Sequence, residues 1–196
     1  HHIAEKKGYS GVSILSKEEP INIFEGLGTE WIDKEGRVLV LEFENFYVCS
    51  VYAPSGTTGD IRQDMKYKFL EDFYKFGESY LKKGKEIAAR KKTLDGIDIH
   101  NPEKQNSTSG FLPEERKWVT SFLELGYEDV FRNLHQNVPD LYSWWSYRAA
   151  SKERNKGWRI DYHLATKGLA SKAVEAEIEM KWDISDHAPV SIVYDV

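Results

Sequence analysis

Short apolar runs separated by turn residues recur along the chain, and they predict a protein dominated by strands. Runs rich in β-branched and aromatic residues occupy residues 11–16, 38–43 and 46–52, and Glu44-Asn45 joins the last two in a tight hairpin. These runs carry little charge, which indicates strands that are covered on both faces. Further strands are expected at residues 142–147, 160–166, 174–180 and 190–194.

Residues 61–83 have the spacing of a long amphipathic helix. Its apolar residues recur at intervals of three or four: Met65, Phe69, Phe73, Phe76 and Tyr80. They form one stripe that is expected to pack in the core. A second helix is expected to begin at Pro113, because proline suits the first helical position, and to stop at Gly126.

Length and composition indicate a single globular domain. The 196 residues are 40% hydrophobic and 30% charged, enough for a sizeable core. No apolar run approaches the ~20 residues that cross a membrane, and the first residues lack the apolar centre of a secretory signal. Cys49 is the single cysteine and cannot form an internal disulfide, so a reducing, cytoplasmic location is expected.

The net charge of −5 argues mildly against a nucleic-acid partner, but the distribution of charge changes the picture. Residues 82–92 hold six basic residues against one acidic, and residues 148–159 hold five against one. Either run could be no more than a solvated surface. Aromatic residues flank the second run, which favours a nucleic-acid contact there.

Candidate catalytic side chains stand at the ends of two predicted strands. Asp186 and His187 lie in a Ser-Asp-His-Ala-Pro turn before the apolar run at 190–193, and Asp161 opens another strand. If these strands are neighbours, Asp161 can accept a hydrogen bond from one ring nitrogen of His187 and leave the other nitrogen facing a substrate. A lone Asp-His pair near a turn is more often a satisfied loop, so the functional interpretation depends on the pairing of two motifs.

Several ordered motifs accompany this pair. They are Gly8-Tyr9-Ser10-Gly11-Val12, Glu35-Gly36-Arg37, Tyr52-Ala53-Pro54-Ser55-Gly56, Asn101-Pro102 followed by Gly110-Phe111-Leu112-Pro113-Glu114-Glu115-Arg116, Tyr142-Ser143-Trp144-Trp145-Ser146-Tyr147, Gly157-Trp158-Arg159-Ile160-Asp161-Tyr162 and Ser185-Asp186-His187-Ala188-Pro189. Over nearly the whole chain they resemble the exonuclease III family of abasic-site DNA repair endonucleases. The resemblance implies a four-layer α/β sandwich of two packed, mainly antiparallel sheets flanked by helices. We expect one endonuclease/exonuclease/phosphatase-like domain over residues 1–196.

The resemblance also implies a reaction. Family members cleave the phosphodiester on the 5′ side of an abasic site, and many remove nucleotides or blocking groups from 3′ ends. By resemblance His187 contacts the scissile phosphate, Asp161 orients His187, and Tyr52 points its hydroxyl at the same phosphate. Asp186 is expected to help hold a divalent cation, Mg²⁺ or Mn²⁺.

Contacts to DNA follow from the same resemblance. Trp144, Trp158 and Ile160 match the apolar pocket for a flipped-out baseless sugar, although core packing alone would also suit them. Three basic residues are expected to bind flanking phosphates: Arg148, Lys152 and Arg154. A further loop matches a DNA-facing loop at three positions, Asn101, Gln105 and Thr108, the last two standing where asparagines are usual. The expected partner is double-stranded DNA with abasic sites or 3′ ends. No membrane partner is expected, and the protein is expected to be a monomer.

Three family motifs are absent from the printed sequence. Two belong to N-terminal strands, which the domain is therefore expected to lack. The third is a Gly-Asp-Phe-Asn strand end expected between Lys85 and Ile97, where Asp95 precedes a glycine instead of following one. About ten residues look removed or replaced there, and deletion of a central strand is hard to tolerate, so we expect a discontinuity or a distorted backbone within residues 87–96. The alternatives are a truncated, catalytically dead DNA-binding relative and another phosphodiesterase of the same fold.

Overall fold

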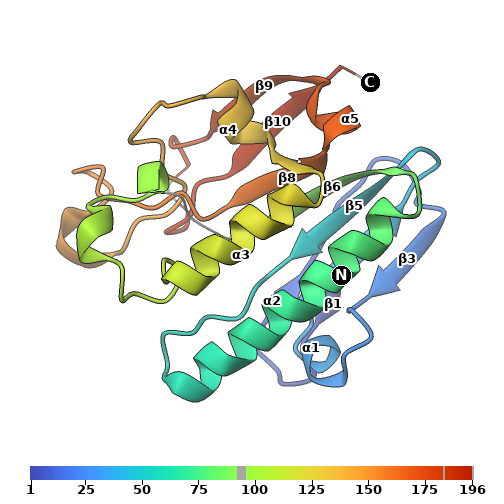
Figure 1. Ribbon diagram of the computed structural model, residues 1–196, viewed down its shortest axis with the longest axis horizontal. Coiled ribbons are helices and arrows are strands. Elements are labelled where there is room, and N and C mark those ends of the chain that lie inside the picture. Colours follow the sequence, from blue (N-terminus) through green and yellow to red (C-terminus); the bar gives the residue numbers. More distant parts are fainter. Residues whose placement is uncertain (92–95, 183, 196) are drawn as a thin grey trace.

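A six-stranded mixed sheet forms the centre of the protein (Figure 1). The computed structural model describes residues 1–91, 96–182 and 184–195. The strands lie in the order β3 (Asn22–Glu25), β4 (Val38–Glu42), β5 (Phe46–Val51), β6 (Glu86–Lys91), β8 (Tyr162–Thr166) and β7 (Tyr127–Asp129). Only β5 and β6 run parallel among these neighbouring pairs.

Two long helices lie side by side over one face of this sheet (Figure 1). They are α2 (Asp60–Leu81) and α3 (Pro113–Glu124). The predicted apolar stripe does face the core, since Phe69, Phe73 and Tyr80 are buried in it while Met65 and Phe76 are partly buried. Both predicted helices are therefore confirmed.

A second, two-stranded sheet packs against the opposite face of β8. It consists of β9 (Ala173–Ile178) and β10 (Val190–Tyr194). Tyr162 and Leu164 of β8 belong to the core beneath the helices, whereas Ala165 packs with Ile192 and Tyr194. This alternation places β8 between two layers, and the expected α/β class with two packed sheets is confirmed.

The remaining elements are short. They are β1 (His2–Ile3), β2 (Gly11–Val12), α1 (Glu30–Lys34), η1 (Gly96–Asp98), η2 (Pro102–Lys104), α4 (Val130–Leu134), η3 (Arg148–Ala150) and α5 (Lys167–Ala170). The strand predicted at 11–16 shrinks to β2. The strand predicted at 142–147 is wrong: Tyr142, Ser143 and Trp145 are all buried, so the segment does not alternate. Among the described residues, no helix has both the length and the apolar character needed to cross a bilayer.

Strand β6 corrects the expected break over the part of it that the structure describes. Its residues pair with β5 on one side, Ile87 opposite Tyr47, and with β8 on the other, Ala88 opposite Ala165. The place of a central strand is therefore filled by a regular segment up to Lys91. The rest of the expected break, Asp95 included, falls on residues 92–95 and lies outside the described part of the chain.

Gly77 in α2 tests how tightly the helices pack. A Cβ atom added there would lie 2.6 Å from the Phe122 ring of α3. In an exposed helix Gly→Ala stabilises by about 1 kcal/mol, but here we expect Gly77→Ala to destabilise by about 1–3 kcal/mol through overpacking. Urea unfolding measures this change, with the exposed Ser79→Ala as a control that should shift stability by less than about 0.5 kcal/mol. A stabilised Gly77→Ala protein would contradict the packing described.

Candidate active site

The backbone around Trp144 joins two segments that are distant in sequence. Trp144 forms isolated β-bridges with Trp158 on one side and with His187 on the other. The Trp144 and Trp158 amides each donate to the other residue's carbonyl oxygen at 2.9 Å, and the Ala188 amide donates to the Ser143 carbonyl at 2.8 Å. The two motifs are thereby fixed edge to edge.

His187 and Asp161 form the predicted hydrogen-bonded pair. Nδ1 of His187 lies 2.7 Å from Oδ2 of Asp161. Because an ionised carboxylate only accepts hydrogen bonds, Nδ1 carries the hydrogen and Nε2 is left facing away from Asp161. The His187 side chain is 34% exposed and that of Asp161 13%, so the ring is the more exposed of the two partners.

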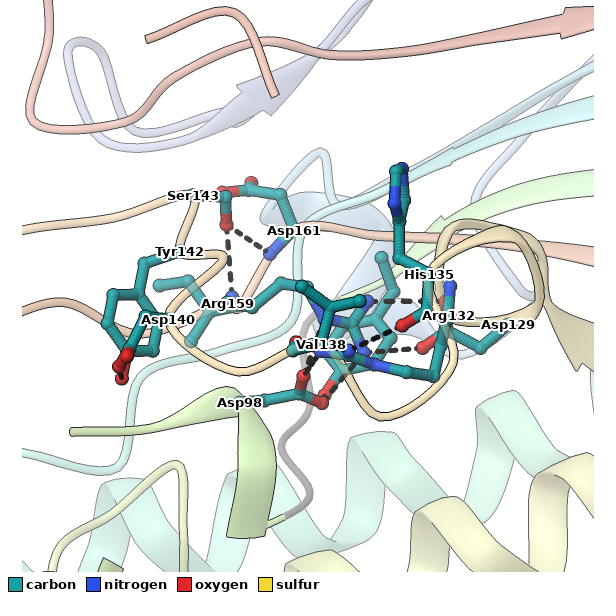
Figure 2. Close-up of polar contacts among 12 residues, drawn as sticks. Asp98, Asp129, Arg132, His135, Val138, Asp140, Tyr142, Ser143, Arg159 and Asp161 are labelled. Carbon is teal, nitrogen blue, oxygen red and sulfur yellow. Dashed lines mark hydrogen bonds and ion pairs between the residues drawn. The ribbon is translucent and has the colours of Figure 1, made fainter. Parts of the chain in front are cut away.

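Ser143 fixes the Asp161 carboxylate from the buried side. Its hydroxyl donates to Oδ2 of Asp161 at 2.9 Å and accepts from the amides of Ile160 and Asp161 at 3.1 and 3.0 Å. Ser143 is completely buried, and Figure 2 shows it beside Asp161. Ser143 was not among the predicted site residues, although a hydroxyl between aromatic residues in the Tyr142–Tyr147 motif was a usable signal.

Asp186 lies on the other side of the Trp144 bridge. The indole Nε1 of Trp144 donates to Oδ2 of Asp186 at 2.9 Å, and the Ser185 hydroxyl lies 3.3 Å from Oδ1. The described residues contain no group of three His, Cys, Asp or Glu side chains that could hold a metal ion. Asp186 and its described neighbours therefore do not fit a metal site by themselves.

The predicted pocket residues lie together. Ile160 is buried in a small apolar cluster with Ile99 and Phe111, and Trp144 and Trp158 pack against it. The two indole rings meet edge to face, with centroids 5.9 Å apart and planes at 77°. The sugar-binding role of this cluster stays a prediction.

Tyr52, another predicted site residue, does not belong to this apolar cluster. It follows β5 and is half exposed. Its carbonyl oxygen accepts from Nη1 of buried Arg37 at 3.0 Å, and the Arg37 guanidinium lies 5.0 Å from the centre of its ring. The expectation that Tyr52 opens into the same cleft as His187 stays a prediction.

The predicted DNA-contacting side chains occupy two loops. In the first, Arg148 and Arg154 are exposed, while Lys152 is half-buried and donates to the Trp182 carbonyl at 3.2 Å. The second loop exposes one residue and partly buries two: Asn101, Gln105 and Thr108, the last two joined by a 2.9 Å hydrogen bond. Their contacts with DNA stay predictions.

Arg159 was predicted only as part of a basic run and of a motif, with no role of its own, but it is buried beneath the site. Its guanidinium binds Asp98 through two hydrogen bonds of 2.8 and 2.7 Å and reaches Asp129 at 2.6 Å (Figure 2). Arg132 and the Tyr162 hydroxyl also bind Asp98. Burial raises the pKa of Asp98, but the hydrogen bonds and charges of the arginines outweigh it and hold this pKa below its ordinary value.

Known proteins resemble this chain in sequence and in architecture. No family model matches the chain. It is 38% identical over 195 residues to an exodeoxyribonuclease of Bacillus subtilis, covering 98% of this chain and 77% of that protein. It is 35% identical over 197 residues to the DNA repair nuclease APEX1 of Danio rerio, covering 96% and 61%. Its fold matches a Neisseria 3′ phosphatase solved with a product DNA hairpin, with a TM-score of 0.85 at 24% identity over 92% of this chain and 73% of that one.

The buried network predicts how stability depends on pH. The pKa of Asp98 is lower in the folded protein than in the unfolded chain. The carboxylate therefore contributes fully to the free energy of unfolding above its unfolded pKa of about 3.9, and this contribution is lost as the pH falls below that value towards the folded pKa. Asp98→Asn should cost about 3–5 kcal/mol at pH 7, since it leaves arginines with too few carboxylates. The difference in free energy of unfolding between Asp98→Asn and the parent protein should become smaller below about pH 4.

Urea unfolding at pH 7 and pH 3 measures both effects. The exposed Asp64 of α2 offers a control, because Asp64→Asn should change stability by less than about 0.5 kcal/mol at either pH. An Asp98→Asn protein that unfolds at the same urea concentration as the parent at pH 7 would contradict the role given to this network.

Proposed function

The chain belongs to the exonuclease III family of abasic-site DNA repair endonucleases, and from this membership we propose that it binds damaged duplex DNA through His187 and the two tryptophans beside it. The proposed reaction is hydrolysis of the phosphodiester 5′ of an abasic site, with action on 3′ ends as a related activity. One observation carries this proposal: the 2.7 Å pair of His187 and Asp161 lies one β-bridge from Trp144.

Each of these residues has a distinct proposed role. With Nδ1 directed to Asp161, His187 presents Nε2 to an oxygen of the backbone phosphate. Asp161, held by Ser143, keeps the ring in that tautomer and orientation. Trp144 and Trp158 would enclose a sugar without a base, which leaves the helix at lower cost because no base has to unstack.

Family membership suggests a divalent cation, Mg²⁺ or Mn²⁺, as cofactor. Asp186 is the acidic residue that family motifs would offer it, yet a cation would need ligands beyond the described residues. We further propose that the partner is double-stranded DNA with abasic sites or 3′ ends, and that the protein acts as a cytoplasmic monomer.

The sequence of β6 sets an expected rate. Where the family has a Gly-Asp-Phe-Asn strand end, β6 closes with Ala88-Ala89-Arg90-Lys91. Catalytic groups that act as a unit lose most of their effect when members are missing. We therefore expect the 196-residue chain to cleave an abasic duplex at least about a thousandfold more slowly than a relative that keeps the motif.

Gel analysis of a labelled abasic duplex with Mg²⁺ or Mn²⁺ measures this rate, and His187→Ala should remove what remains. Turnover equal to that of the relative would refute the importance given to the motif. Binding with no cleavage would favour the second candidate function, a DNA-binding relative that does not cut.

Binding provides an independent test of the pocket. Because basic side chains displace counterions from DNA, the affinity for DNA should fall steeply as salt increases. Arg148→Ala should weaken binding to abasic and to intact duplex equally. Trp158→Ala should instead reduce the preference for abasic over intact duplex, by about 1–3 kcal/mol or roughly fivefold to 150-fold. Fluorescence anisotropy with the two duplexes separates these effects. Equal binding of both by the parent protein would remove the pocket from the proposal.

A further inference from the structure

Trp144 has a contact that lining an apolar pocket does not require. Its ring packs on the Ile99–Phe111–Ile160 cluster and against Trp158, while its indole nitrogen donates to Oδ2 of Asp186 at 2.9 Å. One side chain thus touches both the apolar pocket and the carboxylate next to His187. A hydrogen bond to an ionised acceptor is stronger than one between neutral groups, so this contact constrains both partners.

The backbone strengthens this connection. Trp144 is bridged to Trp158 and to His187, so its main chain is held from both sides. Trp158, the other half of the indole pair, makes no side-chain hydrogen bond to a described residue. The two tryptophan side chains therefore differ in one hydrogen bond, and its acceptor, Asp186, is the neighbour of His187 in the sequence.

We propose that Trp144 is a positioning residue that couples occupation of the apolar pocket to the orientation of the Asp186 carboxylate beside His187. The inference rests on the proposed function, in which this pocket receives a baseless sugar. By binding Oδ2, the indole N–H restricts the rotation of the Asp186 carboxylate. Without that bond the carboxylate is free to turn, and it repels the phosphate that an abasic site brings closest.

The substitution Trp144→Phe removes the N–H and keeps an aromatic ring. We expect it to lower the preference for abasic over intact duplex by about tenfold, the effect of one hydrogen bond to a charged group. Trp158→Phe shortens the neighbouring ring without removing such a bond and should lower the preference less. Trp118→Phe is the matched control: the Trp118 indole in α3 donates to the Leu70 carbonyl of α2 at 2.8 Å, and it packs against a different core cluster from Trp144 and Trp158, so its loss should leave the preference unchanged.

A double-mutant cycle assigns the effect to Asp186. In an Asp186→Ala background, Trp144→Phe should change the preference by less than about twofold, because the bond is already absent. Asp186→Ala removes a negative charge and should strengthen binding to any DNA. The ratio of the affinities for abasic and intact duplex cancels this general effect. A full Trp144→Phe effect in that background, or an effect no larger than that of Trp158→Phe, would overturn the coupling.

A measurement without DNA separates this inference from the proposed function. In ¹H–¹⁵N spectra, the Trp144 indole proton should exchange more slowly than that of Trp158 and should shift strongly in Asp186→Ala. An unchanged Trp144 signal in that variant overturns the coupling alone. A parent protein without preference for abasic duplex overturns the proposed function, and the coupling with it, even if the signal shifts.

Discussion

The guanidinium group of Arg159 lies buried between the carboxylates of Asp98 and Asp129, two residues before Asp161 in the segment that leads into β8. Charges taken out of water are stable only when their partners saturate them. Here Arg159 donates two hydrogen bonds to Asp98 and another to Asp129, and the Tyr162 hydroxyl also donates to Asp98. Each buried charge is thereby paired. The network ties η1, the start of α4 and β8 to one point, so the segment from Trp158 to Asp161 has a rigid base.

Above this base, the positions of the proposed functional groups follow from backbone geometry. Arg159 donates its amide to the Asp98 carbonyl, while the next residues along the chain bind Ser143. Ser143 in turn belongs to the segment that bridges to His187. The orientation of the partly exposed His187 imidazole therefore depends on the buried ion pair of Arg159 and Asp98, through the hydrogen bonds of Ser143 and Asp161.

Sequence patterns anticipated the parts of this arrangement that are local or carried by motifs. The α2 stripe follows from helical spacing, and the pair of His187 and Asp161 follows from two motifs at strand ends. The partners of Arg159 were not predictable, because they lie 61 and 30 residues away and nothing in the local sequence distinguishes a buried arginine within a basic run. Strand β6 was missed for a related reason: Arg90 and Lys91 are unusual in a strand between two neighbours, where apolar residues are the rule.

The hydroxyl of Ser143 donates once and accepts twice, so its full hydrogen-bonding capacity is used by Asp161 and the two amides. Natural variation at this position is therefore restricted by chemistry more than by size. Threonine keeps the hydroxyl and asks only for room for a methyl group, whereas alanine, cysteine and valine each leave two amides without an oxygen acceptor. Across evolutionary time, this buried residue should alternate between serine and threonine even in relatives whose surface loops have diverged beyond alignment.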